Sequence, residues 1–177
     1  ALEPRARTTY LGSMSSPGRI LIAGAGAVGS VIGGLLARAG HDVTLLGRGP
    51  HLDAIARDGL AVDGLYGSHR VVRIAGVTTA AGLTGAFDTI LLTVKSWDTA
   101  AMIAAIAGRL AADGVVVCLQ NGLGNLETVT AQVGGDHTIG GRVIFGAEIP
   151  RPGSVRVTVH AEPTLIGPPA GAPPRLE

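Results

Sequence analysis

Short apolar runs alternate with longer amphipathic stretches along the chain from residue 19 onward. Runs rich in Val, Ile and Leu predict strands, and stretches with apolar residues three or four positions apart predict helices. The predicted strands cover residues 20–23, 42–46, 60–63, 71–74, 89–94, 115–119, 138–145, 154–160 and 165–166. The predicted helices cover 50–58, 99–112, 125–133 and a segment of small residues between the first two strands. Strands spaced by helices predict an α/β fold with a doubly wound, mainly parallel sheet.

A glycine-rich turn connects the first predicted strand to the helix that follows it. Gly24, Gly26 and Gly29 form the pattern G-x-G-x-x-G within a strand–turn–helix–strand unit of about 30 residues, which is typical of Rossmann-type dinucleotide-binding domains. The first glycine permits the tight turn, the second lets the backbone approach a pyrophosphate, and the third lets the helix pack closely on the strand. Free N–H groups at the helix N-terminus attract the anion. The pattern predicts cofactor contacts from Gly24, Ala25, Gly26, Ala27, Val28 and Gly29.

The residue that follows the second predicted strand bears on the choice of cofactor. Folds that prefer NAD place an Asp or Glu there, on the ribose hydroxyls, whereas this chain has Gly47 and Arg48. An arginine at that point pairs with a 2′-phosphate, so we expect NADP(H) as the cofactor. The alternative is that Arg48 is a solvated loop cation, and equally tight binding of NADH would favour that interpretation.

The composition argues against several classes of partner. The net charge of +1 is too close to zero to indicate a nucleic acid or a lipid surface. Residues 20–37 form an uncharged stretch of 18 residues, long enough to nominate a membrane span. Its five glycines disfavour a continuous helix, so we expect no membrane span. The single cysteine, Cys118, lies in an apolar run, which predicts a buried strand residue and fits a reducing cytoplasm.

The chain divides into three expected segments. Residues 1–13 show no periodicity and end in Gly-Ser before Met14, which predicts an expression tag. Residues 14–167 form the predicted NADP-binding Rossmann domain. Residues 168–177 are rich in Pro and Gly, which is typical of a linker that leaves a domain.

Two loops after predicted strands carry residues capable of chemistry, at the sheet edge where ligands of such folds bind. Lys95 directly follows a buried strand and offers a compact cation for a phosphate or a carboxylate, or it is a surface lysine. Trp97 either forms a wall of a nicotinamide pocket or covers a helix end. Asn121 either donates to a ligand carbonyl or belongs to an ordinary Asn-Gly turn.

Together these segments resemble the ketopantoate reductase (2-dehydropantoate 2-reductase) family. The resemblance rests on GAGAVGS at 24–30, Arg48, TVKSWD at 93–98 and QNGLGN at 120–125, with further similarity at 153–168. It implies NADPH-dependent reduction of a 2-oxo acid, ketopantoate, to D-pantoate in pantothenate biosynthesis. It also implies that Arg48 binds the 2′-phosphate, that Lys95 touches cofactor or substrate, and that Asn121 lies near the nicotinamide and the substrate.

The chain departs from the family in one respect that concerns catalysis. Family members carry a C-terminal helical domain that supplies the general-acid lysine and other substrate-binding side chains, and we expect this domain to be absent. Hydride transfer to a ketone leaves an alkoxide that needs a proton. Lys95 is the only lysine of the sequence, and the resemblance gives it a binding role. We therefore expect the isolated chain to bind NADPH and to turn over ketopantoate poorly or not at all.

Other functions and partners stay open at this point. One alternative is a non-catalytic NADP-binding module, and another is a relative that reduces a different 2-oxo acid. An S-adenosylmethionine methyltransferase also has a glycine-rich turn, but it usually carries an acid where this chain has Gly47-Arg48. Apolar surface left by the absent domain makes a homodimer a further alternative. His51, His69 and His137 have no companions at metal-ligand spacing, and His41 and His160 are expected to be structural, so we expect no metal.

Overall fold

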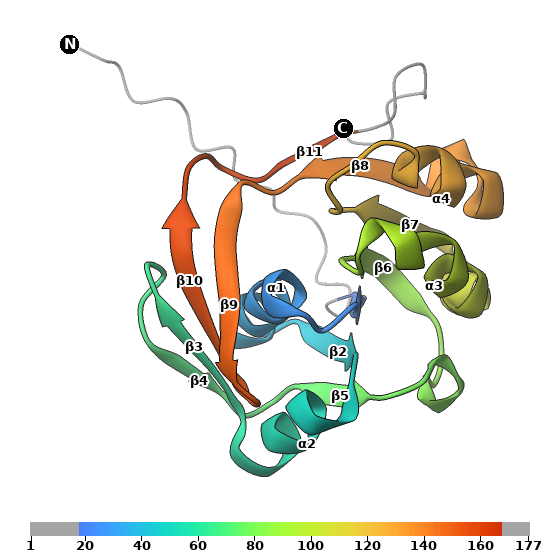
Figure 1. The fold of residues 1–177 in the computed structure, drawn as a ribbon. Coiled ribbons are helices and arrows are strands. Elements are labelled where there is room, and N and C mark those ends of the chain that lie inside the picture. Colours follow the sequence, from blue (N-terminus) through green and yellow to red (C-terminus); the bar gives the residue numbers. More distant parts are fainter. Residues whose placement is uncertain (1–17, 168–177) are drawn as a thin grey trace, which may run out of the picture.

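The computed structural model describes residues 18–167 and contains a seven-stranded sheet with a four-stranded sheet beside it (Figure 1). The order of the large sheet is β5 (Ala75–Val77), β2 (Asp42–Leu46), β1 (Arg19–Ala23), β6 (Phe87–Leu92), β7 (Leu110–Cys118), β8 (Thr138–Arg142) and β11 (Leu165–Gly167). All neighbours are parallel except β11, which pairs antiparallel with β8. Counted along the chain, the six parallel strands have the order 3-2-1-4-5-6 of dinucleotide-binding folds. The predicted fold class is confirmed.

Within residues 18–167, four α-helices cover the two faces of the large sheet. They are α1 (Ala27–Arg38), α2 (Gly49–Asp58), α3 (Thr99–Ile106) and α4 (Asn125–Val133). Short 3-10 turns lie at Ala80–Gly82, Ser96–Asp98, Ala107–Arg109 and Gly135–His137. Residues of β1 alternate between two cores, with Ile22 on the side of α1 and α2 and Leu21 on the side of α3 and α4. This alternation buries both faces, as a doubly wound sheet requires.

The smaller sheet lies against α1, on the side away from the large sheet. Its order is β4 (His69–Val71), β3 (Leu60–Gly64), β10 (Ser154–His160) and β9 (Phe145–Arg151). Figure 1 shows α1 between this sheet and the strands β1 and β2. A Cβ added at Gly33 would lie 2.8 Å from Leu45 Cδ2 of β2, and one added at Gly34 would lie 2.8 Å from Leu60 Cδ2 of β3. Two adjacent glycines therefore let α1 fit between the two sheets.

Two predicted strands were placed wrongly. Residues 71–74 were expected to form one strand, but β4 ends at Val71 and β5 begins at Ala75. Strand β5, the third parallel strand, was missed because it has only three residues, contains a glycine and lies largely exposed at the sheet edge. Residues 138–145 were expected to form one strand, but β8 ends at Arg142 and β9 begins at Phe145 in the other sheet. Hydrophobic pattern alone does not mark where a chain changes sheets.

The predicted helix over residues 99–112 is too long. Helix α3 ends at Ile106, a 3-10 turn follows, and β7 begins at Leu110. Leu110 fits the helical spacing of the preceding apolar residues, but it pairs with Phe87 across β6 and β7. Tertiary pairing therefore overrides the local period, and Gly108 weakens the helix at the same point. The expected tag at 1–13 and the linker at 168–177 lie outside the described residues.

Candidate functional site

The carboxyl ends of four parallel strands place the predicted site residues at one edge of the large sheet. Ala23 is level with Leu46 of β2 and with Leu92 of β6, and Leu92 is level with Cys118 of β7. The loops that leave these strands contain the glycine turn, Arg48, Lys95 and Asn121. The structure therefore brings all the predicted segments to the edge where ligands of doubly wound sheets bind.

The glycine turn is tied to the end of β2. The N–H groups of Gly24 and Ala25 donate to the carbonyl oxygen of Leu46 at 3.0 and 2.8 Å. Gly24 has a φ of +123°, which favours glycine, and a Cβ there would lie 2.6 Å from the backbone nitrogen of Val94. Because the amide of Ala25 is already bonded and its side chain is buried, this residue can shape the turn but has no free N–H for a ligand.

Gly26 and Gly29 have opposite surroundings. A Cβ added at Gly29 would lie 2.2 Å from the carbonyl oxygen of Gly24, so only glycine fits there. A Cβ added at Gly26 would meet no atom within 4 Å, and Gly26 is exposed. Gly26 is the N-cap of α1, and the first-turn amides of Ala27, Val28 and Gly29 have no partner inside the helix. This open turn of N–H groups fits the pyrophosphate of a dinucleotide.

Arg48 lies close to the glycine turn. It is the N-cap of α2, is exposed, and forms no ion pair within residues 18–167. A Cβ added at the preceding Gly47 would lie 2.5 Å from the Cβ of Ala25. The backbone directly after β2 therefore packs against the glycine turn. The Arg48 guanidinium that comes next in the chain is available for an anionic ligand.

Lys95, Trp97 and Asn121 are exposed in the loops after β6 and β7. Trp97 is 80 % exposed, so it does not cover a helix end among the described residues. These two loops are joined by hydrogen bonds around Asn125, which is 5 % exposed. Sequence analysis assigned no role to Asn125, because a polar residue at a helix start is ordinarily solvated.

Thr93 is a second site residue that received no role from the sequence. Its hydroxyl donates to the carbonyl oxygen of Gly24 at 2.7 Å and joins the loop after β6 to the glycine turn. Its backbone N–H donates to the carbonyl oxygen of Ala23 at 2.9 Å. Its position directly after an apolar strand is the one sequence feature that could have indicated this role.

His51 is buried and joins three segments of the fold. Its Nδ1 accepts a hydrogen bond of 3.1 Å from the N–H of Gly153, so its Nε2 carries the proton and donates to Ser30 Oγ at 3.1 Å. Ser30 belongs to α1, His51 to α2, and Gly153 to the turn between β9 and β10. Burial lowers the pKa of His51 below its ordinary value, which keeps the ring neutral.

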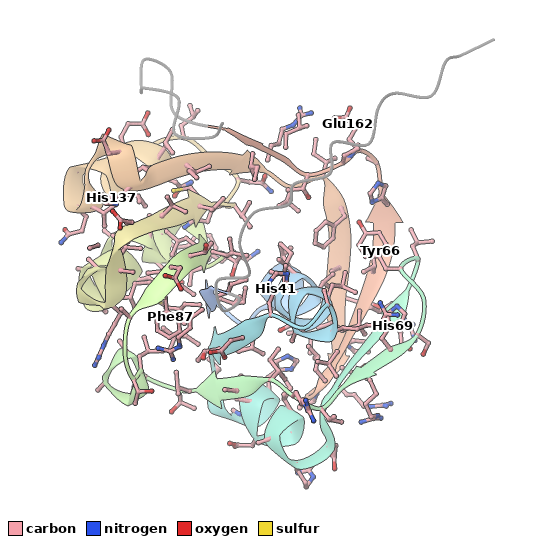
Figure 2. All side chains as sticks on the ribbon, turned by 180° about the vertical axis from the view of Figure 1, so that it is seen from behind. His41, Tyr66, His69, Phe87, His137 and Glu162 are labelled. Atoms are coloured by element: carbon pink, nitrogen blue, oxygen red, sulfur yellow. The ribbon has the colours of Figure 1, made fainter. Side chains whose placement is uncertain are left out.

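Three other histidines have structural contacts. His160 Nδ1 lies 2.5 Å from the hydroxyl of Tyr66, and His69 Nε2 donates to the Tyr66 carbonyl at 2.8 Å. Figure 2 shows Tyr66 and His69 on the hairpin of the small sheet. His137 Nδ1 donates to the carbonyl oxygen of Gly114 at 2.7 Å. Residues 18–167 contain no group of three potential metal ligands.

Cys118 ends β7 and is 4 % exposed, which confirms the predicted buried strand residue. Burial raises the pKa of its thiol to about 11, so the thiol stays protonated at neutral pH.

No helix within the described range is long and apolar enough to cross a bilayer.

Comparison with known proteins gives consistent matches to one family. A family model described as ketopantoate reductase PanE/ApbA matches residues 20–171. The 2-dehydropantoate 2-reductase of Pyrococcus horikoshii is 42% identical over 137 residues, which cover 77% of this chain and 43% of that protein. The enzyme of the same name from Halobacterium salinarum is 37% identical over 148 residues, 83% of this chain and 48% of that protein. The chain thus spans less than half the length of these relatives.

Solved structures show the same fold. A PanE/ApbA family ketopantoate reductase from Ralstonia eutropha superimposes with a TM-score of 0.76 at 33% identity, covering 86% of this chain and 50% of that one. A D-mandelate dehydrogenase solved with NADH and anilino(oxo)acetate gives a TM-score of 0.72 at 27% identity, covering 79% of this chain and 45% of that one.

Proposed function

Because this chain belongs to the PanE/ApbA ketopantoate reductase family, we propose that it is the cofactor-binding part of an NADPH-dependent 2-oxo acid reductase. The proposed reaction is the reduction of 2-dehydropantoate (ketopantoate) to D-pantoate, which is the activity named for the relatives from Pyrococcus and Halobacterium. Since the chain spans less than half of those relatives, the complete reaction is proposed for the longer protein of the family.

The carrying observation is the arrangement of Gly26, the first turn of α1 and Arg48. The first-turn amides of Ala27, Val28 and Gly29 would bind the pyrophosphate, and the open space over Gly26 lets it approach the backbone. Arg48 directly follows Gly47, which packs against Ala25 of the glycine turn, and its guanidinium would bind the 2′-phosphate. No acid stands at the end of β2 to favour NADH.

Lys95 and Asn121 would act at the other end of the cofactor. When bound, NADPH supplies the hydride. The ammonium of Lys95 would hold a substrate carboxylate or a cofactor phosphate, and the exposed amide of Asn121 would donate to the substrate carbonyl or the nicotinamide amide. These groups bind and orient, and the proton for the product alkoxide comes from elsewhere.

Titration calorimetry with NADPH and NADH tests this proposal, on the parent chain and on Arg48→Ala. A charge-assisted contact to the 2′-phosphate is worth roughly 10- to 100-fold in affinity, so NADPH should bind that much more tightly than NADH. Arg48→Ala should remove the difference. Arg38→Ala, an exposed arginine at the opposite end of α1, is the control and should leave the preference unchanged. Equal affinities in the parent chain would refute the choice of NADPH.

A relative that reduces another 2-oxo acid is the second candidate. Similarity to the D-mandelate dehydrogenase that was solved with NADH favours it. Tight binding of NADH by this chain would favour this second candidate over the NADPH-dependent ketopantoate reductase. Binding of neither nucleotide would support neither candidate.

A further inference from the structure

The loops that contain Lys95 and Asn121 are held together by one buried amide. Asn125 is the first residue of α4, and its Nδ2 donates to the carbonyl oxygens of Asn121 and Gly122 at 3.1 and 3.2 Å. The same nitrogen lies 3.3 Å from Ser96 Oγ in the loop after β6. The side chain therefore bonds to both loops at once.

The orientation of this amide is fixed from its other side. Gln120 Nε2 donates to Thr99 Oγ1 at 2.7 Å, so the Thr99 hydroxyl hydrogen is free to point at Asn125 Oδ1, which lies 2.8 Å away. Thr99 is 2 % exposed. Because the carbonyl oxygens of Asn121 and Gly122 can only accept, Asn125 presents its nitrogen to the loops, and its oxygen accepts from the Thr99 hydroxyl. Gln120 therefore donates to Thr99, and Thr99 in turn donates to Asn125.

Ser96 completes the connection between the loops. Its hydroxyl donates to the carbonyl oxygen of Asn121 at 2.5 Å. Gly122 has a φ of +104°, and a Cβ there would lie 3.1 Å from Ser96 Oγ. Ser96 directly follows Lys95, and Asn121 directly precedes Gly122, so both candidate ligand-binding residues flank these contacts.

We infer that Asn125 is a positioning residue that sets the distance between the Lys95 loop and the Asn121 loop. It holds the main chain of Asn121 and leaves the Asn121 side chain exposed for a ligand. The part of this inference that concerns the cofactor rests on the proposed function. Asn125 should then affect the nicotinamide end of NADPH and leave binding of the adenosine end at the glycine turn unchanged.

Three variants separate positioning from general stability. Asn125→Ala removes the amide, and Thr99→Val removes only the hydroxyl that orients it while keeping the side-chain shape. Thr128→Val is the matched control, because the Thr128 hydroxyl donates to the carbonyl oxygen of Gly124 at 2.7 Å and, within residues 18–167, forms no hydrogen bond with Asn125. If Asn125→Ala does not fold, Thr99→Val carries the test alone.

The first measurement needs no ligand. Backbone ¹⁵N relaxation of residues 95–98 and 120–124 should show that both loops become more mobile together in Asn125→Ala and Thr99→Val. Because the Thr128 hydroxyl bonds to Gly124, Thr128→Val should affect residues 120–124 at most and leave residues 95–98 unchanged. Increased mobility in residues 120–124 alone would overturn the inference, because the loops would then be independent.

The second measurement compares NADPH with 2′,5′-ADP, which lacks the nicotinamide half. Asn125→Ala and Thr99→Val should weaken NADPH about tenfold, the effect of one lost hydrogen bond, and change 2′,5′-ADP less than about twofold. Equal weakening of both ligands would overturn the positioning role. If the parent chain binds neither ligand, the proposed function fails, and the relaxation data decide the coupling of the loops by themselves.

Discussion

The hydroxyl of Thr93 donates a hydrogen bond of 2.7 Å to the carbonyl oxygen of Gly24. This contact joins the loop after β6 to the turn after β1, and it fills the space beneath Gly29, where a Cβ would lie 2.6 Å from Thr93 Oγ1. The predicted ligand turn is thus supported by a residue from the loop that follows β6.

Replacing Thr93 by valine should loosen the glycine turn. The substitution keeps the side-chain shape and removes the donor to Gly24, so we expect a loss of about 1 kcal/mol in the free energy of unfolding. NADPH affinity should fall several-fold, because the turn amides become less well fixed. Urea denaturation and titration calorimetry measure the two effects. Unchanged values in both would contradict the supporting role of Thr93.

Alanine at Gly29 and at Gly26 should affect different properties. At Gly29 the Cβ would lie 2.2 Å from a backbone oxygen, so we expect destabilisation by about 2 kcal/mol or more. At Gly26 the Cβ meets no protein atom within 4 Å and the backbone φ is −81°, so stability should stay within about 0.5 kcal/mol. Gly26→Ala should nevertheless impair NADPH binding, because the Cβ points into the space assigned to the pyrophosphate. Normal NADPH binding by this variant would argue against that assignment.

Protonation of His51 should destabilise the fold as the pH falls. Burial places the pKa of His51 below the value of about 6.5 in the unfolded chain, so the unfolded state binds the proton more readily. The contribution is complete above pH 6.5 and is lost as the pH falls below it, by at most about 1.4 kcal/mol per pH unit. Thermal melts between pH 7.5 and 5 of the parent chain and of His51→Gln would measure it, with exposed His41→Gln as the control. An identical pH dependence in all three proteins would exclude this role.

Cys118 should resist thiol reagents in the folded protein. With a pKa of about 11 and 4 % exposure, it should react with Ellman's reagent at pH 8 only as fast as the end of β7 opens. Addition of guanidinium chloride should release one reactive thiol. A chain with Cys118→Ala and Ser68→Cys, which places the thiol in an exposed turn, should react at once. Equally rapid reaction of the folded parent would mean that β7 does not bury this residue.

The chain alone should bind NADPH without reducing ketopantoate at an appreciable rate. Lys95 is the only lysine and is assigned to binding, so no residue at this edge is assigned as the proton donor for the alkoxide. Oxidation of NADPH followed at 340 nm, with and without ketopantoate, measures this. Turnover comparable to that of a full-length family member would show that a residue of this chain donates the proton.

Local sequence pattern was sufficient for the core of the fold and for the geometry of the glycine turn. Residues 20–23 of β1 and residues 115–118 of β7 form continuous apolar runs, and Gly24 and Gly29 have steric requirements that only glycine meets. These features depend on neighbours within about 30 residues, the size of one strand–helix–strand unit.

The small sheet and the Asn125 contacts depend on partners that are distant in the sequence. Strand β10 pairs in parallel with β3, about 90 residues earlier, and no periodic pattern encodes such a pairing. In the sequence Asn125 is an ordinary helix-start residue, and its role becomes visible only through its hydrogen bonds to Ser96 and Thr99, which belong to another loop and helix. The NADP preference of Arg48 and the roles of Lys95 and Asn121 stay predictions.

The position of α1 between two sheets has a thermodynamic consequence for any ligand at its N-terminus. Gly33 and Gly34 leave no space for the helix to shift sideways, and His51 fixes Ser30 within its first turn. The amide donors are therefore already ordered before a ligand arrives, and association does not have to restrict them further. The heat-capacity change of binding should accordingly reflect desolvation of the ligand and its contact surface, with no contribution from helix formation.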